Sequence, residues 1–109
     1  MQLVKCIVRP DKVIDIKDAL EKINVPGLTV IESRGHGQQK GHTAMYRGKE
    51  YFVSLLPKMM IEIVVPDDQV DAVVRTVTNV ARTGQIGDGR IFVLPVTQSF
   101  KIRTGERDA

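Results

Sequence analysis

The sequence is poor in cysteine and in aromatic residues, and it has no apolar run near the ~20 residues that a membrane-spanning helix needs. Its one cysteine, Cys6, excludes an internal disulfide and a thiolate metal cluster. Its five aromatics are too few for a sheet that stacks RNA bases. Residues 1–5 lack the charged-then-apolar pattern of an export signal. We therefore expect one cytoplasmic domain over residues 1–109, with no membrane insertion and no nucleic-acid partner.

The positive charge of the chain is concentrated in two segments. The formal net charge is only +3, but residues 34–58 carry +4, residues 82–103 carry +3, and the rest of the chain carries −4. A field confined to two short segments favours small anions over a long polyanion.

Strand-like and helix-like stretches alternate along the chain. Alternating β-branched residues predict strands over Gln2–Arg9, Leu28–Ser33, Met59–Val65 and Arg90–Pro95, and a short extended tail over Gln98–Arg103. Proline and acidic residues suit a first helical turn, so helices are predicted from Pro10 and from Pro66. Their apolar stripes are Val13, Ile16, Leu20 and Ile23, then Val70, Val73, Val74, Val77 and Val80 or Ala81. The order βαββαβ predicts an α+β, ferredoxin-like fold.

Every predicted strand is apolar on both sides, although two helices can cover only one face of a four-stranded sheet. The first apolar set is Leu3, Ile7, Ile61, Ile63 and Val93, and the second, which cannot share its face, is Val4, Val8, Met60, Val64 and Phe92. A single domain of this length has nothing left to cover the second face. The pattern therefore predicts an oligomer.

The stretch from Gly35 to Pro57 has no helix or strand pattern and is far longer than the roughly 2–5 residues of an ordinary hairpin loop. It holds both histidines, both tyrosines and four of the nine glycines. This composition favours a loop that anchors a partner, with a solvated hairpin extension as the alternative.

A second unusual segment, Thr83–Arg90, has three glycines followed directly by an arginine. Glycines allow backbone N–H groups to approach an anion closely, which indicates a phosphate site. The alternative is that Gly84 only ends the preceding helix. His36 and His42 have no paired nucleophile and no third metal ligand, so we expect neither catalysis nor a protein metal site.

Three segments resemble signatures of the PII nitrogen-regulatory proteins. Gly35–Thr43, followed by Tyr46-Arg47-Gly48 and Glu50-Tyr51, closely resembles the family's long T-loop, residues 37–55 of this chain. Ala81–Val93 is similar to its B-loop signature, with the B-loop at residues 82–90, and Ile102–Glu106 matches its C-terminal loop at residues 101–109. The resemblance implies a homotrimer of ferredoxin-like subunits that binds ATP or ADP in clefts between neighbouring subunits.

The resemblance also implies the ligand-binding residues. Thr29 and Val64 would hold the adenine. The rest of the nucleotide site would be Gly35, Gly37, Gln38, Gln39, Thr83, Gly84, Gly87, Asp88, Gly89 and Arg90, with Lys101 and Arg103 from a neighbouring subunit. Gln39 would bind Mg²⁺ together with the phosphates. The effector 2-oxoglutarate would bind that metal together with Gln39, Lys40, Gly41 and Lys58.

In such proteins the T-loop is the output of the sensor, because the bound ligands select its conformation and thereby its partner. The resemblance implies an ammonium transporter, a nucleotidyltransferase and enzymes of nitrogen metabolism, including the regulation of glutamine synthetase, as partners. Arg47 would plug an ammonium channel and recruit the chain to the inner membrane, and Tyr51 would be modified by uridylylation.

Three positions differ from the residues common in the family: Gln38 for arginine, Arg90 for lysine and Lys101 for arginine. The exchanges alter geometry at the phosphates and leave the nucleotide preference open. Two alternative functions also remain at this stage, a trimer that hydrolyses ATP slowly in the same clefts and a structural trimer without ligands.

Overall fold

The computed structural model describes residues 1–36, 42–53 and 55–109, and between 42 and 53 it describes the backbone, with side chains only at 47 and 48. The described elements are β1 (Gln2–Val8), η1 (Pro10–Lys12), α1 (Val13–Lys22), β2 (Thr29–Gly35), β3 (His42–Tyr46), β4 (Lys49–Val53), β5 (Leu56–Val65), η2 (Asp67–Gln69), α2 (Val70–Ala81) and β6 (Arg90–Pro95). Neither α-helix among these residues is long and apolar enough to span a membrane.

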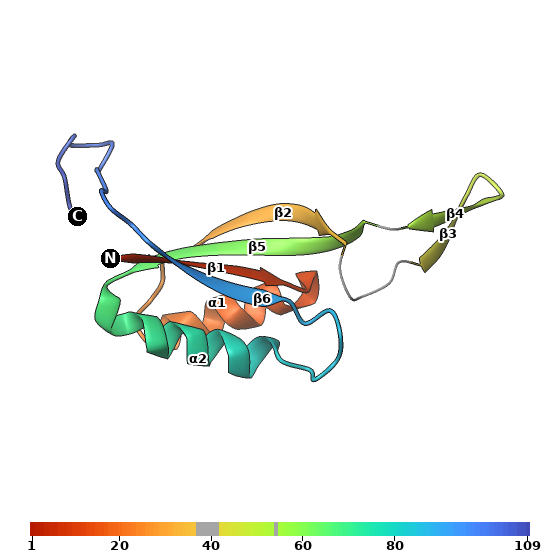
Figure 1. Cartoon of the computed structure of the whole chain (residues 1–109), viewed down its shortest axis with the longest axis horizontal. Coiled ribbons are helices and arrows are strands. Elements are labelled where there is room, and N and C mark those ends of the chain that lie inside the picture. Colours follow the sequence, from red (N-terminus) through yellow and green to blue (C-terminus); the bar gives the residue numbers. More distant parts are fainter. Residues whose placement is uncertain (37–41, 54) are drawn as a thin grey trace.

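The main sheet has the order β2-β5-β1-β6, and every neighbouring pair is antiparallel. Both α-helices lie on one face of this sheet (Figure 1). The predicted ferredoxin-like βαββαβ fold is therefore confirmed. The third predicted strand, β5, begins at Leu56 and not at Met59, because its first residues pair with the end of β2.

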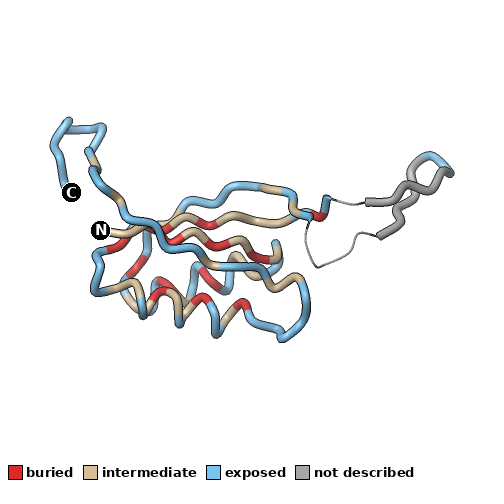
Figure 2. Tube along the Cα trace, viewed as in Figure 1, coloured by how far each residue is buried: buried red, intermediate tan, exposed pale blue. Residues whose placement is uncertain are grey.

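The predicted apolar stripes form the core between helices and sheet. Ile16 and Leu20 of α1 and Val73, Val77 and Ala81 of α2 are buried against the sheet. Figure 2 shows the buried positions gathered on β1, β5 and the helix sides that face them, whereas β2 and β6 are mostly exposed. The edge strands therefore keep accessible surface.

The open face of the sheet is apolar, as predicted, but the predicted grouping of its residues was wrong. Val4 pairs with Ile63 and Val93, and these three share the helix-covered side. The opposite side, here called the open face, carries Leu3, Ile7, Met60, Val64, Phe92 and Leu94. The predicted alternation of side chains between the two faces was correct within each strand. The relative register of β1 against β5 and β6 is set by long-range pairing that no single strand encodes.

The prediction that the stretch from Gly35 to Pro57 has no strands was also wrong. Strands β3 and β4 pair antiparallel as a separate two-stranded hairpin, which projects from one end of the main sheet (Figure 1). Arg47 and Gly48 at its tip both have positive φ, 50° and 75°. Two successive positive φ values mark a type I′ turn, whose twist suits a tight hairpin.

The C-terminal segment turns back on itself, so the predicted extended tail over Gln98–Arg103 holds only as far as Phe100. Lys101 N–H donates to the Glu106 carbonyl at 2.8 Å, and Gly105 N–H donates to the Lys101 carbonyl at 2.7 Å. A bridge between Phe100 and Arg107 closes the turn. Gly105, with φ of 73°, makes this reversal possible.

Candidate anion-binding site

The B-loop connects the end of α2 to the start of β6. Helix α2 ends at Ala81 with Arg82 as its C-cap, so Gly84 lies within the loop and is not the helix cap. Gly84, Gly87 and Gly89 all have positive φ, between 86° and 103°. A side chain on Gly89 would overlap the backbone of β1 at Ile7, so the loop lies directly on the end of that strand.

The carboxylate of Asp88 organises the first half of the B-loop. It accepts hydrogen bonds from the backbone N–H of Thr83 at 2.8 Å and of Gly84 at 2.9 Å, and also from the Thr83 hydroxyl. The Thr83 hydroxyl and N–H, followed by the Gly84 N–H, hold the pKa of Asp88 well below its usual range. Asp88 is therefore an anion held within the loop.

Two cations from the sheet hold the second half of the loop. Arg9 donates from Nη2 to the Ile86 carbonyl at 2.8 Å, and its Nε lies 3.4 Å from Oδ1 of Asp88. Lys58 donates from Nζ to the Gly87 carbonyl at 2.9 Å. Partial burial lowers the pKa of Lys58, and the nearby Arg9 lowers it further. The structure thus brings cations from β5 and from the end of β1 to one loop.

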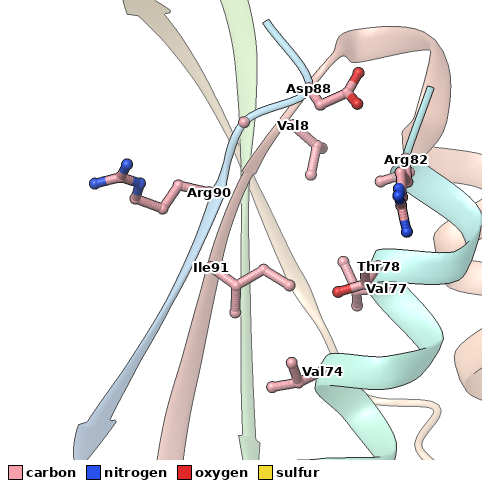
Figure 3. A pocket seen from close by; sticks show the side chains of 10 residues that line it. Val8, Val74, Val77, Thr78, Arg82, Asp88, Arg90 and Ile91 are labelled. Atoms are coloured by element: carbon pink, nitrogen blue, oxygen red, sulfur yellow. The ribbon is translucent and has the colours of Figure 1, made fainter. Parts of the chain in front are cut away.

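The predicted ligand residues of the main sheet share the open face. They are Thr29, Lys58, Val64 and Arg90, whose ladder partners alternate with the helix-covered positions. Figure 3 shows the Arg90 side chain projecting from β6 away from α2. The cations Lys58 and Arg90 therefore face the same side of the sheet as Thr29 and Val64.

A single chain nevertheless keeps these residues apart. Thr29 lies on the edge strand β2 and Arg90 on the opposite edge strand β6. Three strand spacings of about 4.8 Å separate those edges by roughly 14 Å. Lys101 and Arg103 lie in the C-terminal segment, at the end of the sheet away from the B-loop (Figure 1). Within this chain, the C-terminal segment therefore lies away from the B-loop.

Several predicted site residues lie outside the described residues or are described only in part. Gly37, Gln38, Gln39, Lys40 and Gly41 lie outside the described residues. Gly35 ends β2 beside Lys58, and Tyr51 pairs with Ala44 in the hairpin ladder, its side chain outside the description. Within the described residues, no group of three His, Cys, Asp or Glu side chains could hold a metal ion.

A pocket of about 300 Å³ lies on the other side of β6, between that strand and α2. Its apolar lining is Val8, Val74, Val77, Ala81 and Ile91, with Thr78, Arg82 and Asp88 also contributing. Figure 3 shows Val74, Val77 and Thr78 on α2 facing Ile91 across the gap. The pocket is lined in part by the B-loop, which Arg9 and Lys58 also contact, but it opens on the helix-covered side.

Sequence reasoning missed Arg9 and its role at the B-loop. Arg9 lies 79 positions before Asp88, and no local pattern links the two. One signal was available in the sequence. Arg9 directly precedes Pro10 at the end of a strand, and by alternation it lies on the same face as Ile7.

Comparison with known proteins gives one consistent result. The family model described as nitrogen regulatory protein P-II matches residues 1–106. Nitrogen regulatory protein P-II 1 of Escherichia coli strain K12 is 52% identical over 108 residues, 99% of this chain and 96% of that protein. Nitrogen regulatory protein P-II of Rhodobacter capsulatus is 49% identical over 106 residues, 97% of this chain and 95% of that protein. The crystal structure of Arabidopsis thaliana PII bound to citrate has a TM-score of 0.78 at 40% identity, over 97% of this chain and 83% of that one.

Proposed function

Because the chain belongs to the P-II family of nitrogen regulatory proteins, we propose that it is a sensor that binds ATP or ADP and 2-oxoglutarate and regulates partner proteins through its T-loop. The observation that carries the proposal is the division of the ligand residues between the two edges of one sheet. Thr29 on β2 and Arg90 on β6 face the same side from opposite edges of the sheet, so within one chain they do not form the two facing walls of a cleft.

In this proposal the chain is a homotrimer whose sheets meet through their open faces. Val64, Phe92 and Leu94 on that face are each at least 40% exposed in the single chain. An apolar patch of this kind costs free energy in water and favours association. Each contact between neighbours would place the β2 edge of one chain beside the β6 edge of the next and so create one cleft.

The nucleotide lies in that cleft. Thr29 and Val64 of one subunit contact the adenine, and Gly35, Gly37, Gln38 and Gln39 belong to the rest of the nucleotide site. The phosphates lie against the second half of the neighbour's B-loop, at Gly87, Gly89, Arg90 and the backbone of Asp88, and Lys101 and Arg103 approach from an adjoining subunit. The Arg90 guanidinium and the glycine amides supply charge-assisted hydrogen bonds to phosphate oxygens.

Thr83 and Gly84 support the B-loop in this proposal and do not contact the phosphates. Their N–H groups already donate to Asp88, so they support the loop from behind and do not face the phosphates. The Thr83 hydroxyl also donates to this carboxylate.

The effector 2-oxoglutarate binds at the base of the T-loop. Lys58 pairs with one carboxylate, while Gln39, Lys40 and Gly41 hold the other end. Mg²⁺ arrives with the nucleotide and binds its phosphates and Gln39. The charged side chains Arg9, Lys58 and Arg90 at this site are cations and do not bind Mg²⁺. They suit a metal that is bound by phosphate oxygens and arrives together with the nucleotide. The relative bound to citrate, a small polycarboxylate, supports this ligand class.

The T-loop hairpin carries the output. Arg47 at its tip is exposed and held by the type I′ turn, in a position to enter a channel or a pocket of a partner. Proposed partners are an ammonium transporter at the inner membrane, a nucleotidyltransferase that uridylylates Tyr51, and enzymes of nitrogen metabolism. Uridylylation would add bulk and negative charge to β4 and so alter partner choice.

Calorimetric titration tests the proposal directly. MgATP and 2-oxoglutarate should each increase the affinity of the other, because they share one metal and one loop. Lys58→Ala should abolish 2-oxoglutarate binding and should weaken MgADP binding only in part, through loss of its bond to the Gly87 carbonyl. Independent binding of the two ligands would contradict the sensor. Steady nucleotide turnover in the same samples would instead support slow ATP hydrolysis.

The partner side is tested by capture from a cell lysate. The chain is immobilised with ADP, or with MgATP and 2-oxoglutarate, beside a variant that lacks residues 42–53. Proteins retained in one ligand state and lost with the hairpin deletion are the expected result. Identical capture in all samples would exclude the T-loop as the output.

A further inference from the structure

The carboxylate of Asp88 is surrounded by donors from both sides of the B-loop. Oδ2 accepts the N–H groups of Thr83 and Gly84, and Oδ1 accepts the Thr83 hydroxyl and lies 3.4 Å from Nε of Arg9. Each oxygen thus has two donors. A carboxylate has about four lone-pair positions, so this one is saturated by the chain itself.

The four donors on the Asp88 carboxylate limit which ligands it can bind. A carboxylate that already accepts four donors has no lone pair left for a metal ion, a ribose hydroxyl or a water ligand. Its negative charge would also repel a polyphosphate unless Arg9 and the amides neutralise it. The carboxylate of Asp88 therefore contacts the loop and not the nucleotide, and only the Asp88 backbone faces the phosphates.

Arg9 connects this carboxylate to the next peptide group. Its guanidinium spans Oδ1 of Asp88 and the carbonyl of Ile86, and Lys58 takes the following carbonyl, that of Gly87. Two adjacent carbonyls are thus turned toward cations. The glycines at 84, 87 and 89 would otherwise leave this segment with many accessible conformations.

We propose that Asp88 is a positioning residue, an internal anion that fills the amide nest of Thr83 and Gly84 and, with Arg9, fixes Gly87–Arg90 in the shape that receives a nucleotide phosphate. The choice of nucleotide phosphate as the ligand rests on the proposed function, whereas the filled nest is a property of the folded chain alone. The nest is preorganised, so the loop loses little entropy when the ligand binds.

Chemical rescue with formate tests this role. Asp88→Ala removes the carboxylate and leaves a small space faced by three donors and Arg9, into which formate fits. We expect MgATP affinity to fall about tenfold in this variant, since charge-assisted bonds that order the loop are lost. Sodium formate should restore much of that affinity, and sodium chloride at equal ionic strength should not.

Amide NMR gives a readout that does not depend on nucleotide. The Gly84 and Thr83 N–H resonances should shift in Asp88→Ala and return toward their wild-type positions as formate is added. Asp67→Ala is the matched control, because Asp67 also accepts side-chain bonds but lies at the opposite end of the sheet, beside Met1. It should change neither these resonances nor the response to formate.

Unchanged MgATP affinity in a folded Asp88→Ala variant, or loss of affinity that formate fails to restore, overturns the positioning role. If Asp88→Ala does not fold, Arg9→Lys keeps the charge but loses the fork that reaches both acceptors, and it should still weaken MgATP binding. Wild-type affinity in Arg9→Lys would then overturn the proposal. If the wild-type chain does not bind MgATP while formate restores the Gly84 resonance, the proposed function fails and the filled nest stands.

Discussion

Gly89 lies so close to Ile7 that a Cβ at position 89 would overlap the Ile7 carbonyl oxygen. This contact seats the B-loop on the end of β1. It also fixes where β6 begins, because Arg90 follows directly and pairs with Ile7 in the ladder. One glycine thus sets both the loop and the register of an edge strand.

Substitution of Gly89 should be costly. Gly89→Ala combines a φ of +103° with this overlap and should lower the free energy of unfolding by about 3 kcal/mol. Gly84→Ala, at φ +86° with open space, should cost only about 1 kcal/mol from backbone strain. Gly27→Ala meets nothing within 4 Å and should be nearly neutral. Urea unfolding of the three variants checks this order, and equal losses at 84 and 89 would contradict the close contact.

Acid should weaken the fold through Asp88. Hydrogen bonds from Thr83 lower the pKa of Asp88 from its usual 3.8. Its contribution to stability is therefore complete above pH 3.8 and is lost as the pH falls below that value toward the folded-state pKa. Unfolding measured from about pH 7 to about pH 3 should show a smaller acid loss in Asp88→Asn than in the wild type.

Asp67 provides the comparison for that experiment. Its pKa is lowered by hydrogen bonds from the Met1 amine and Gln2. Asp67→Asn should also reduce the acid dependence, but it should leave MgATP affinity intact. A change in nucleotide affinity in both variants would point to general loosening and not to the B-loop.

Lys58 should make 2-oxoglutarate binding sensitive to alkali. Burial and Arg9 lower the pKa of Lys58 from 10.5, and only the protonated ammonium pairs with a carboxylate. Affinity should therefore be highest below that lowered pKa and should fall as the pH rises through it. Calorimetry between about pH 7 and about pH 10 checks the fall, which should be absent in Lys58→Arg because arginine stays charged above pKa ~12. A flat wild-type profile would contradict the pairing.

Charge on the open face should dissociate the assembly. Phe92 is 44% exposed on that face, and burial of an aspartate there in a subunit contact would leave an unpaired charge out of water. Phe92→Asp should convert the proposed trimer into monomers in sedimentation velocity. Ile14→Asp is the control, because Ile14 on α1 is 64% exposed on the helical side. Dissociation by Ile14→Asp alone would place the contact on the helices.

The type I′ turn should control how Arg47 is presented. Gly48 has φ of 75°, which asparagine tolerates and valine does not. Gly48→Val should reduce partner capture from lysate several-fold, and Gly48→Asn should retain it. MgATP affinity should be equal in both, because the turn lies far from the B-loop. Equal capture by the two variants would show that the hairpin turn does not matter to the partner.

Local patterns were enough for most of the fold. The stripe through Val73, Val77 and Ala81 predicted the buried side of α2, and strand alternation predicted an apolar second face. The register of β1 against β5 depends on pairing between residues some 60 positions apart, such as Val4 with Ile63, and the predicted grouping of faces failed there. The hairpin was missed because its turn uses Arg47 and Gly48 where a stronger signal would be Asn-Gly.

At the candidate site, too, the sequence predicted some features and missed others. Glycine spacing and Arg90 marked the B-loop as an anion site. The task of Asp88 could not be predicted, because it depends on the direction of the Thr83 and Gly84 N–H groups and on Arg9 from a distant strand. Spacing shows which residues are near in sequence, not which donors a carboxylate has already taken.

Thr29 and Arg90 lie on opposite edges of one sheet, and this has a consequence for measured affinity. The proposed two-chain cleft would exist only at concentrations where the chains associate, so nucleotide binding and assembly would be linked equilibria. Each nucleotide bound would raise the association constant of the subunits by the same factor by which association raises nucleotide affinity. Dilution of the protein alone would then release the ligand, and a dissociation constant would have meaning only when quoted with the concentration of the chain.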